Sequence, residues 1–129
     1  MRKIIIDCDP GIDDALAIFL ALASRNDIEV LGLTCVKGNV ALDKTYLNAQ
    51  RICAAAGRLD IPVLRGIARP ILAPAGLGAS VHGVDGLGDI DLPAAEGLPE
   101  TGRNAVDFIL KLAEKYPGEI ALCAIGPMT

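Results

Sequence analysis

The chain contains 129 residues, of which 52% are hydrophobic and 22% charged, and its formal net charge is −4. This size suits one domain with a real core, and the composition excludes disorder, a coiled coil and collagen. The acidic balance argues against nucleic acid or an anionic membrane as the main partner, and no apolar stretch reaches the roughly 18 residues of a membrane helix.

Apolar runs and turn residues divide the chain into alternating strands and helices. Short continuous apolar runs predict buried strands, and longer Ala- and Leu-rich stretches with acidic first turns predict helices. In chain order we expect a strand at 3–8, a helix at 13–24, a strand at 28–36, a helix at about 40–56, a strand at 61–64, a helix at 104–115 and a strand at 119–125. This alternation predicts an α/β fold, a parallel sheet flanked by helices and joined by right-handed crossovers.

Two stretches depart from this regular pattern. The span 66–102 is rich in Gly, Pro and Ala and shows little periodicity. Loops longer than roughly 12–15 residues are usually functional or disordered, so we expect either a long active-site loop or a floppy insertion here. The sequence also stops at Thr129, directly after an expected strand. We therefore expect residues 1–129 to be the N-terminal part of a single longer domain.

The cysteines indicate a reducing compartment. Cys8, Cys35, Cys53 and Cys123 are widely spaced and form no CxxC pair. Dispersed cysteines and one histidine make no zinc-ligand cluster, so we interpret the thiols as reduced and buried. No signal peptide is recognisable at the N-terminus, and we expect a cytoplasmic protein.

Four aspartates, Asp7, Asp9, Asp13 and Asp14, fall within eight residues, where the first strand ends and the first helix begins. A helix terminus stabilises each acid by only about 0.3–1 kcal/mol. Two carboxylates roughly 4 Å apart repel by about 4 kcal/mol at an effective dielectric constant of about 20. The side chains must therefore splay into water, share a proton or bind a cation. We favour a cation, and hard oxygen ligands favour Ca²⁺ or Mg²⁺.

The position of these acids supports a binding site. Ligands of open α/β sheets bind at the carboxyl ends of the strands. Asp7 and Asp9 end the first strand, Asn39 follows the second, and residues 125–129 follow the last. If these strands are neighbours, their polar groups meet at one edge of the sheet.

The segment DCDPGIDDALAI, at 7–18, resembles the N-terminal signature of the inosine-uridine preferring nucleoside hydrolases. The resemblance continues in order with TCVKGN at 34–39, NAQRI at 48–52, VHGVDGLG at 81–88 and AIGPMT at 124–129. It implies a Rossmann-like nucleoside hydrolase fold and the hydrolysis of the N-glycosidic bond of ribonucleosides to ribose and free base. Members of that family are much longer, so the likeness is to their N-terminal part.

The resemblance also implies a Ca²⁺ ion on the pocket floor. Its ligands would be Asp9, Asp14 and the backbone carbonyl of Ile125, with Asp7 as a further candidate, and the ribose 2′- and 3′-hydroxyls would complete the shell. Asp9 would in addition be the general base for the water that attacks C1′.

The same resemblance assigns the substrate contacts. Asp13 would bind a ribose hydroxyl, Asn39 would line the sugar site, and His82 would lie near the nucleobase. Read from the sequence alone, His82 is equally consistent with a surface-loop histidine. Asp85 and Asp89 match no EF-hand, and we expect them to be solvated loop acids.

Several alternatives stay open. One alternative is an inactive fragment or a metal- or ribose-binding module, and we expect little or no hydrolysis by these 129 residues alone. A second copy or a missing C-terminal portion would supply the remaining site residues. A Mg²⁺-dependent aspartyl-phosphate phosphatase would use Asp7 as nucleophile and Asp9 as acid/base, but Gly11 and the Asp13–Asp14 pair do not fit that family's pattern.

Overall fold

The computed structural model describes residues 1–69, 71–72, 81–96 and 104–128. The elements in chain order are β1 (Arg2–Cys8), α1 (Ile12–Ala23), β2 (Ile28–Cys35), α2 (Leu42–Ala55), β3 (Val63–Arg65), α3 (Ala105–Lys115) and β4 (Ile120–Ala124). Every element expected from the sequence is present, and no boundary moves by more than two residues.

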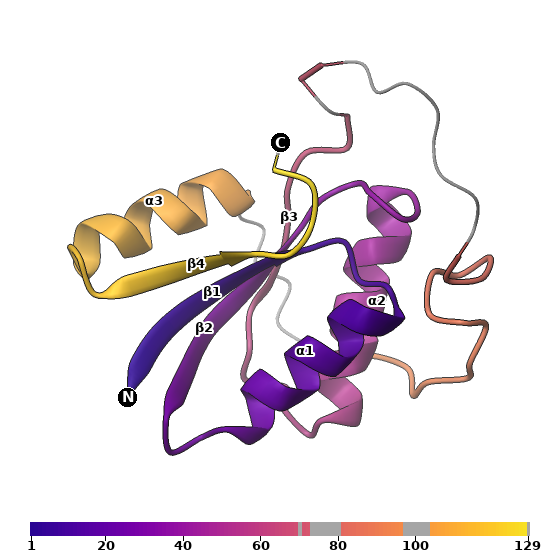
Figure 1. Cartoon of the computed structure of the whole chain (residues 1–129), viewed down its shortest axis with the longest axis horizontal. Helices are drawn as coiled ribbons and strands as arrows, with labels where there is room; N and C mark the ends of the chain where they lie inside the picture. The colour runs from indigo at the N-terminus through magenta and orange to yellow at the C-terminus, as the bar shows by residue number, and fades with distance from the viewer. Residues whose placement is uncertain (70, 73–80, 97–103, 129) are drawn as a thin grey trace.

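The strands form one parallel sheet in the order β3-β2-β1-β4, which confirms the expected α/β class. Helices α1 and α2 cover one face of this sheet, and α3 lies on the other (Figure 1). Strand β1 is central, with β2 and β4 on its two sides. The strands that carry the candidate site residues are therefore neighbours, as the interpretation of the acidic segment required.

A register shift between β1 and β2 determines which side chains of the two strands share a face of the sheet. The pairing of β1 with β2 slips between Ile4 and Ile5, so that Ile4 faces Val30 while Ile5 faces Gly32. One face then packs against α1 and α2 through a buried core that includes Ile4, Ile6, Cys8, Val30, Leu33 and Cys35. On the other face Gly32 leaves room for Phe108 of α3.

Main-chain hydrogen bonds join the segments that leave the carboxyl ends of the strands. The amides of Ile125 and Gly126 donate to the carbonyl of Asp7 at 2.9 and 3.1 Å. The amide of Val36 donates to the carbonyl of Cys8 at 3.0 Å. The ends of β1, β2 and β4 are thus held at one edge of the sheet.

All four cysteines carry free thiols, and Cys8, Cys35 and Cys53 are buried while Cys123 is half-buried. The expectation of unpaired cysteines is therefore confirmed. Among the helices of the described residues, none has the length and apolar character needed to cross a membrane.

The contact between Gly32 and Phe108 gives a test of how tightly α3 packs. A Cβ on Gly32 would lie 2.6 Å from Cζ of Phe108 and 3.1 Å from the carbonyl oxygen of Pro62. We expect Gly32→Val to lower the free energy of unfolding by about 1–3 kcal/mol, because overpacking forces backbone shifts. Urea unfolding would measure the loss, and adding Phe108→Leu should recover part of it. Equal losses in the single and double variants would contradict this packing.

Candidate active site

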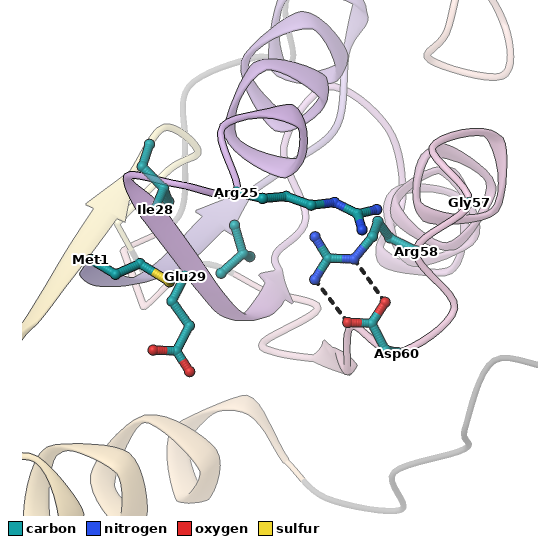
Figure 2. A pocket seen from close by; sticks show the side chains of 8 residues that line it. Met1, Arg25, Ile28, Glu29, Gly57, Arg58 and Asp60 are labelled. Atoms are coloured by element: carbon teal, nitrogen blue, oxygen red, sulfur yellow. Dashed lines mark hydrogen bonds and ion pairs between the residues drawn. The ribbon is translucent and has the colours of Figure 1, made fainter.

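A hollow in the described structure lies at the opposite end of the sheet from the aspartates. It has a volume of about 340 Å³ and is lined by Met1, Arg25, Ile28, Glu29, Val30, Gly57, Arg58 and Asp60. These residues surround the amino ends of β1 and β2, and two hydrogen bonds of 2.8 Å pair Arg58 with Asp60 (Figure 2). Parallel sheets bind ligands at the opposite end, where the aspartates lie.

Asp9 is the centre of the acidic segment. Its side chain lies just beyond the end of β1, and the residue is only 7% exposed. The backbone amide of Asn39 donates to Oδ2 of Asp9 at 2.8 Å, and the Asn39 side-chain nitrogen donates to the Asp9 carbonyl at 2.9 Å. Asn39 therefore fixes both the main chain and the carboxylate of Asp9.

Two glycines make room for this carboxylate. A Cβ on Gly38 would overlap Oδ2 of Asp9. A Cβ on Gly126 would lie 2.9 Å from both the backbone nitrogen and Oδ1 of Asp9. The Asp9 side chain thus lies between the segment after β2 and the segment after β4, with the main chain of Ile125 and Gly126 beside it.

Asp14 meets Asp9 from the first turn of α1. Its Oδ2 accepts a hydrogen bond of 3.1 Å from the Asp9 backbone amide, and the residue is 6% exposed. Burial, together with the charge of Asp9, raises the pKa of Asp14 to about 6. Burial also raises the pKa of Asp9, although the Asn39 amide opposes that rise by stabilising the carboxylate.

Asp13 and His82 lie at the more open side of the site. Nδ1 of His82 accepts a hydrogen bond of 3.2 Å from the backbone amide of Ile12. Nε2 of His82 lies 3.8 Å from Oδ1 of Asp13, and the two side chains are 19% and 79% exposed. His82 is therefore a docked side chain at the N-terminus of α1, and the Asp13 carboxylate is open to solvent.

Asp7 has a separate environment. Its side chain accepts a hydrogen bond from Oγ1 of Thr34 on the neighbouring strand β2. Burial raises the pKa of Asp7, and the Thr34 hydroxyl opposes the rise. Within the ranges that the structure describes, no three His, Cys, Asp or Glu side chains gather closely enough to hold a metal ion. The structure thus brings Asp9 and Asp14 together without adding Asp7 as a third carboxylate.

The acids of the long loop have a structural function that differs from the expectation. Oδ1 of Asp85 accepts hydrogen bonds from the amides of Leu87 and Asp89, at 2.7 and 2.9 Å. Oδ1 of Asp89 accepts from the amides of Val84 and Asp85, at 2.9 and 3.1 Å. These side chains organise the loop backbone and are more than solvated acids. Other parts of the span 66–102, at 70, 73–80 and 97–102, lie outside the described residues.

Sequence reasoning missed four residues that shape the site: Gly38, Gly126, Thr34 and Asn48. The motif TCVKGN contains two of them, and a glycine beside a functional Asn is a signal for close backbone approach. Thr34 and Asn48 lie in the quoted segments TCVKGN and NAQRI, but their roles could not be read from the sequence, because each acts on a segment distant in the chain.

The donor set of Asp9 and Asp14 is of the type that binds a hard divalent cation. Two adjacent carboxylates with raised pKa values repel each other, and a bound cation would relieve that repulsion. Ca²⁺ takes roughly six to eight oxygen ligands. Two carboxylates and a main-chain carbonyl fit part of such a shell, so water, substrate or further protein oxygens would have to complete it.

Comparison with known proteins finds relatives that match almost the whole chain. The sequence profile of the family described as "Inosine-uridine preferring nucleoside hydrolase" matches residues 4–129. The chain is 44% identical over 130 residues to "Probable uridine nucleosidase 2" of Arabidopsis thaliana, covering 99% of this chain and 40% of the relative. The chain thus spans about 40% of the length of the curated relatives that it matches.

Solved structures show the same likeness. A "Plant nucleoside hydrolase" superimposes with a TM-score of 0.88 at 39% identity, covering 99% of this chain and 40% of that one. A "Purine-Preferring Ribonucleoside Hydrolase from Gardnerella vaginalis" gives a TM-score of 0.88 at 33% identity, covering 99% of this chain and 41% of that one.

The raised pKa of Asp14 predicts how stability depends on pH when no metal is present. The folded chain retains the Asp14 proton up to about pH 6, whereas the unfolded chain releases it near pH 3.8. The folded state therefore binds more protons in this window, and the Asp14 contribution to stability falls as the pH rises from 3.8 to about 6.

We expect Asp14→Asn to be more stable than the native chain at neutral pH in the presence of a chelator, by about 1–3 kcal/mol, because it removes a buried charge. The difference should shrink toward pH 4, and urea unfolding at several pH values would measure it. Asp13→Asn, at an exposed neighbouring position, is the matched control and should change stability little. A native chain more stable than Asp14→Asn at neutral pH would contradict the raised pKa.

Proposed function

The chain belongs to the inosine-uridine preferring nucleoside hydrolase family, and from this premise we propose that it carries the ribose-binding and water-activating part of a ribonucleoside hydrolase site. The reaction is hydrolysis of the N-glycosidic bond, which releases ribose and free base. The observation that supports this most is the buried Asp9–Asp14 pair, held by Asn39 at the carboxyl end of the central strand.

We propose Ca²⁺ as the metal of this site. Asp9, Asp14 and the backbone carbonyl of Ile125 would hold it, and the bound ion would orient the ribose 2′- and 3′-hydroxyls and make water easier to deprotonate. The proximity of Gly126 to Asp9 supports this choice, because it places the Ile125 peptide beside the carboxylates.

Asp9 is the proposed general base. Its carboxylate would take the proton from the water that attacks C1′ as the bond to the base breaks, and a positioned base typically contributes about 10²–10⁴-fold. Burial raises the pKa of Asp9, which strengthens it as a base. The Asn39 amide donates to Oδ2 of Asp9 and fixes the orientation of the carboxylate. The other oxygen, Oδ1, would then take the proton.

The surrounding acids and His82 would bind the substrate. The exposed carboxylate of Asp13 is free to accept a hydrogen bond from a ribose hydroxyl, and Asn39 lies beside the same space. Negative charge close to C1′ would stabilise the oxocarbenium-like transition state. His82, docked above the N-terminus of α1, would contact the nucleobase.

A second candidate is binding of ribose and a cation without turnover. It is favoured by the finding that, among the described residues, only two carboxylates meet at the site and no larger ligand group is present. The phosphatase alternative is disfavoured, because the Asp7 side chain that would be its nucleophile already bonds to Thr34.

We also propose that the chain associates with further protein surface, either a second copy or additional chain. Leu16 and Leu20 lie on the outer face of α1 and are 68% and 70% exposed. Strand β4 is at the edge of the sheet, and Leu122 on it is half exposed. Exposed apolar side chains at these two separate places are candidate contacts for further protein surface, because exposed apolar patches often mark protein interfaces.

The free thiols support a cytoplasmic location for this protein. Three of the four are buried among apolar residues, where they pack as small hydrophobic side chains. Unpaired cysteines are typical of reducing compartments.

The role of Asp9 predicts a loss of turnover. Where the protein releases ribose from uridine, inosine or other ribonucleosides, Asp9→Asn should lower kcat by about 10²–10⁴-fold, because the amide cannot accept the proton. Measuring ribose and free base together would follow the reaction. Asp27→Asn, an exposed acid at the other end of the sheet, is the control and should keep the native rate. An Asp9→Asn protein with the native rate would remove Asp9 as the base.

Metal binding predicts a stability change that needs no turnover. Adding Ca²⁺ at one hundred times its dissociation constant should stabilise the chain by about 2.7 kcal/mol. Thermal unfolding at neutral pH would detect this as a higher Tm, and Asp9→Asn or Asp14→Asn should abolish it. A chain that gains no stability from millimolar Ca²⁺, and binds none by calorimetry, would contradict the proposed metal.

A further inference from the structure

The loop at 81–92 is a preorganised unit. Besides the four hydrogen bonds that Asp85 and Asp89 accept, the amide of Gly88 donates to the carbonyl of His82 at 2.6 Å. The backbone from His82 to Asp89 is therefore closed on itself. A contact at one point of this loop fixes the position of the whole unit, including His82.

One buried side chain joins this loop to the aspartate segment. Asn48, in the middle of α2, is 1% exposed. Its Nδ2 donates to the carbonyl of Asp85 at 2.9 Å and to the carbonyl of Pro10 at 3.4 Å. Pro10 follows Asp9 directly, so a single carboxamide connects the turn that carries Asp9 with the loop that carries His82.

We propose that Asn48 is a positioning residue of the site, which sets the place of His82 relative to Asp9 and Asp13. The carboxamide supplies two N–H donors, and each is used on a different carbonyl. The link between this position and nucleobase binding rests on the proposed hydrolase function. The positioning of His82 by Asn48 does not depend on that proposed function.

Two further side chains that hold the loop do not reach the aspartate segment. Lys44 donates to the carbonyl of Val84 at 2.8 Å, but this contact is exposed and does not reach the aspartate segment. Leu87 is buried in the core, which anchors the loop without fixing its direction. Only Asn48 among these three contacts both segments.

The loop backbone lies directly on the Asn48 side chain. Gly86 has φ of +90°, and a Cβ there would lie 3.0 Å from Cγ2 of Val40 and 3.1 Å from Nδ2 of Asn48. Because Asn48 is buried, it cannot move aside to admit a larger residue. Gly86→Ala should therefore strain the loop backbone and displace it from Asn48 and Val40.

His82 offers a direct readout, because it is the only histidine in the chain. A neutral imidazole that accepts at Nδ1 carries its proton on Nε2, so its one free lone pair is engaged by the Ile12 amide. Acylation of this histidine by diethyl pyrocarbonate then requires the loop to open. The acylation rate, measured by mass spectrometry of the peptide that contains His82, reports how firmly the loop is held.

We expect Asn48→Asp and Gly86→Ala to raise the acylation rate of His82 by about tenfold or more, since losing a buried hydrogen bond favours the open state. Asn48→Asp is nearly isosteric but places an acceptor oxygen against two carbonyls. Thr45→Val is the matched control: it removes a buried hydroxyl of the same helix, which bonds to Val36 and Leu42 and not to the loop. Its acylation rate should stay near the native one.

Unchanged His82 acylation in a folded Asn48→Asp or Gly86→Ala chain would overturn the proposal, and so would an equal increase in Thr45→Val. If Asn48→Asp does not fold, Gly86→Ala provides the test, because it strains the loop at residue 86 and leaves the Asn48 carboxamide itself unchanged. The outcome is independent of turnover, so a chain that hydrolyses no nucleoside can still confirm or refute the role of Asn48. Where turnover is measurable, the loop variants should raise KM more than they lower kcat, in contrast to Asp9→Asn.

Discussion

The site depends on two carboxylates that are kept close together and out of water. Asp9 and Asp14 are both nearly buried, and burial raises the pKa of each above its ordinary value, with the charge of Asp9 adding to the rise for Asp14. Backbone amides compensate in part, because Asn39 donates to Asp9 and Asp9 donates to Asp14. These hydrogen bonds orient the carboxylates without neutralising them, and unfavourable charge at a fixed position is what a cation or a reacting proton can relieve.

The fold supplies this arrangement through the position of β1. As the central strand, it delivers Asp9 to a point that the segments after β2 and β4 both reach. Those segments approach closely because Gly38 and Gly126 lack side chains at the two points of contact. The regular parallel sheet thus determines where the site is, and two local backbone features determine how tightly Asp9 is enclosed.

The sequence predicted the elements well because each carries a local signal: apolar runs for the strands, acidic first turns for the helices, and Gly57 after α2. It also indicated the aspartate segment, whose charge density needs an explanation. It did not predict the bond from Asp7 to Thr34 or the bonds from Asn48 to Pro10 and Asp85. These contacts join residues far apart in the chain, and their partners are backbone carbonyls or a common hydroxyl, which leave no pattern in a single sequence.

The contrast between Asp13 and Asp14 follows from the helix period. Asp14 is in phase with Ile18, Ala21 and Leu22, which are buried against the sheet, so the helix turns its carboxylate inward toward Asp9. Asp13 is rotated by one residue onto the face that carries the exposed Leu20, and its carboxylate points to solvent. Two identical side chains at adjacent positions are thereby given different environments, one buried beside Asp9 and the other open to solvent. A one-residue insertion ahead of Asp13 in the first turn of α1 would bring Asp13 into the inward phase and rotate Asp14 out of it, so the apolar stripe of this helix is itself a determinant of the site.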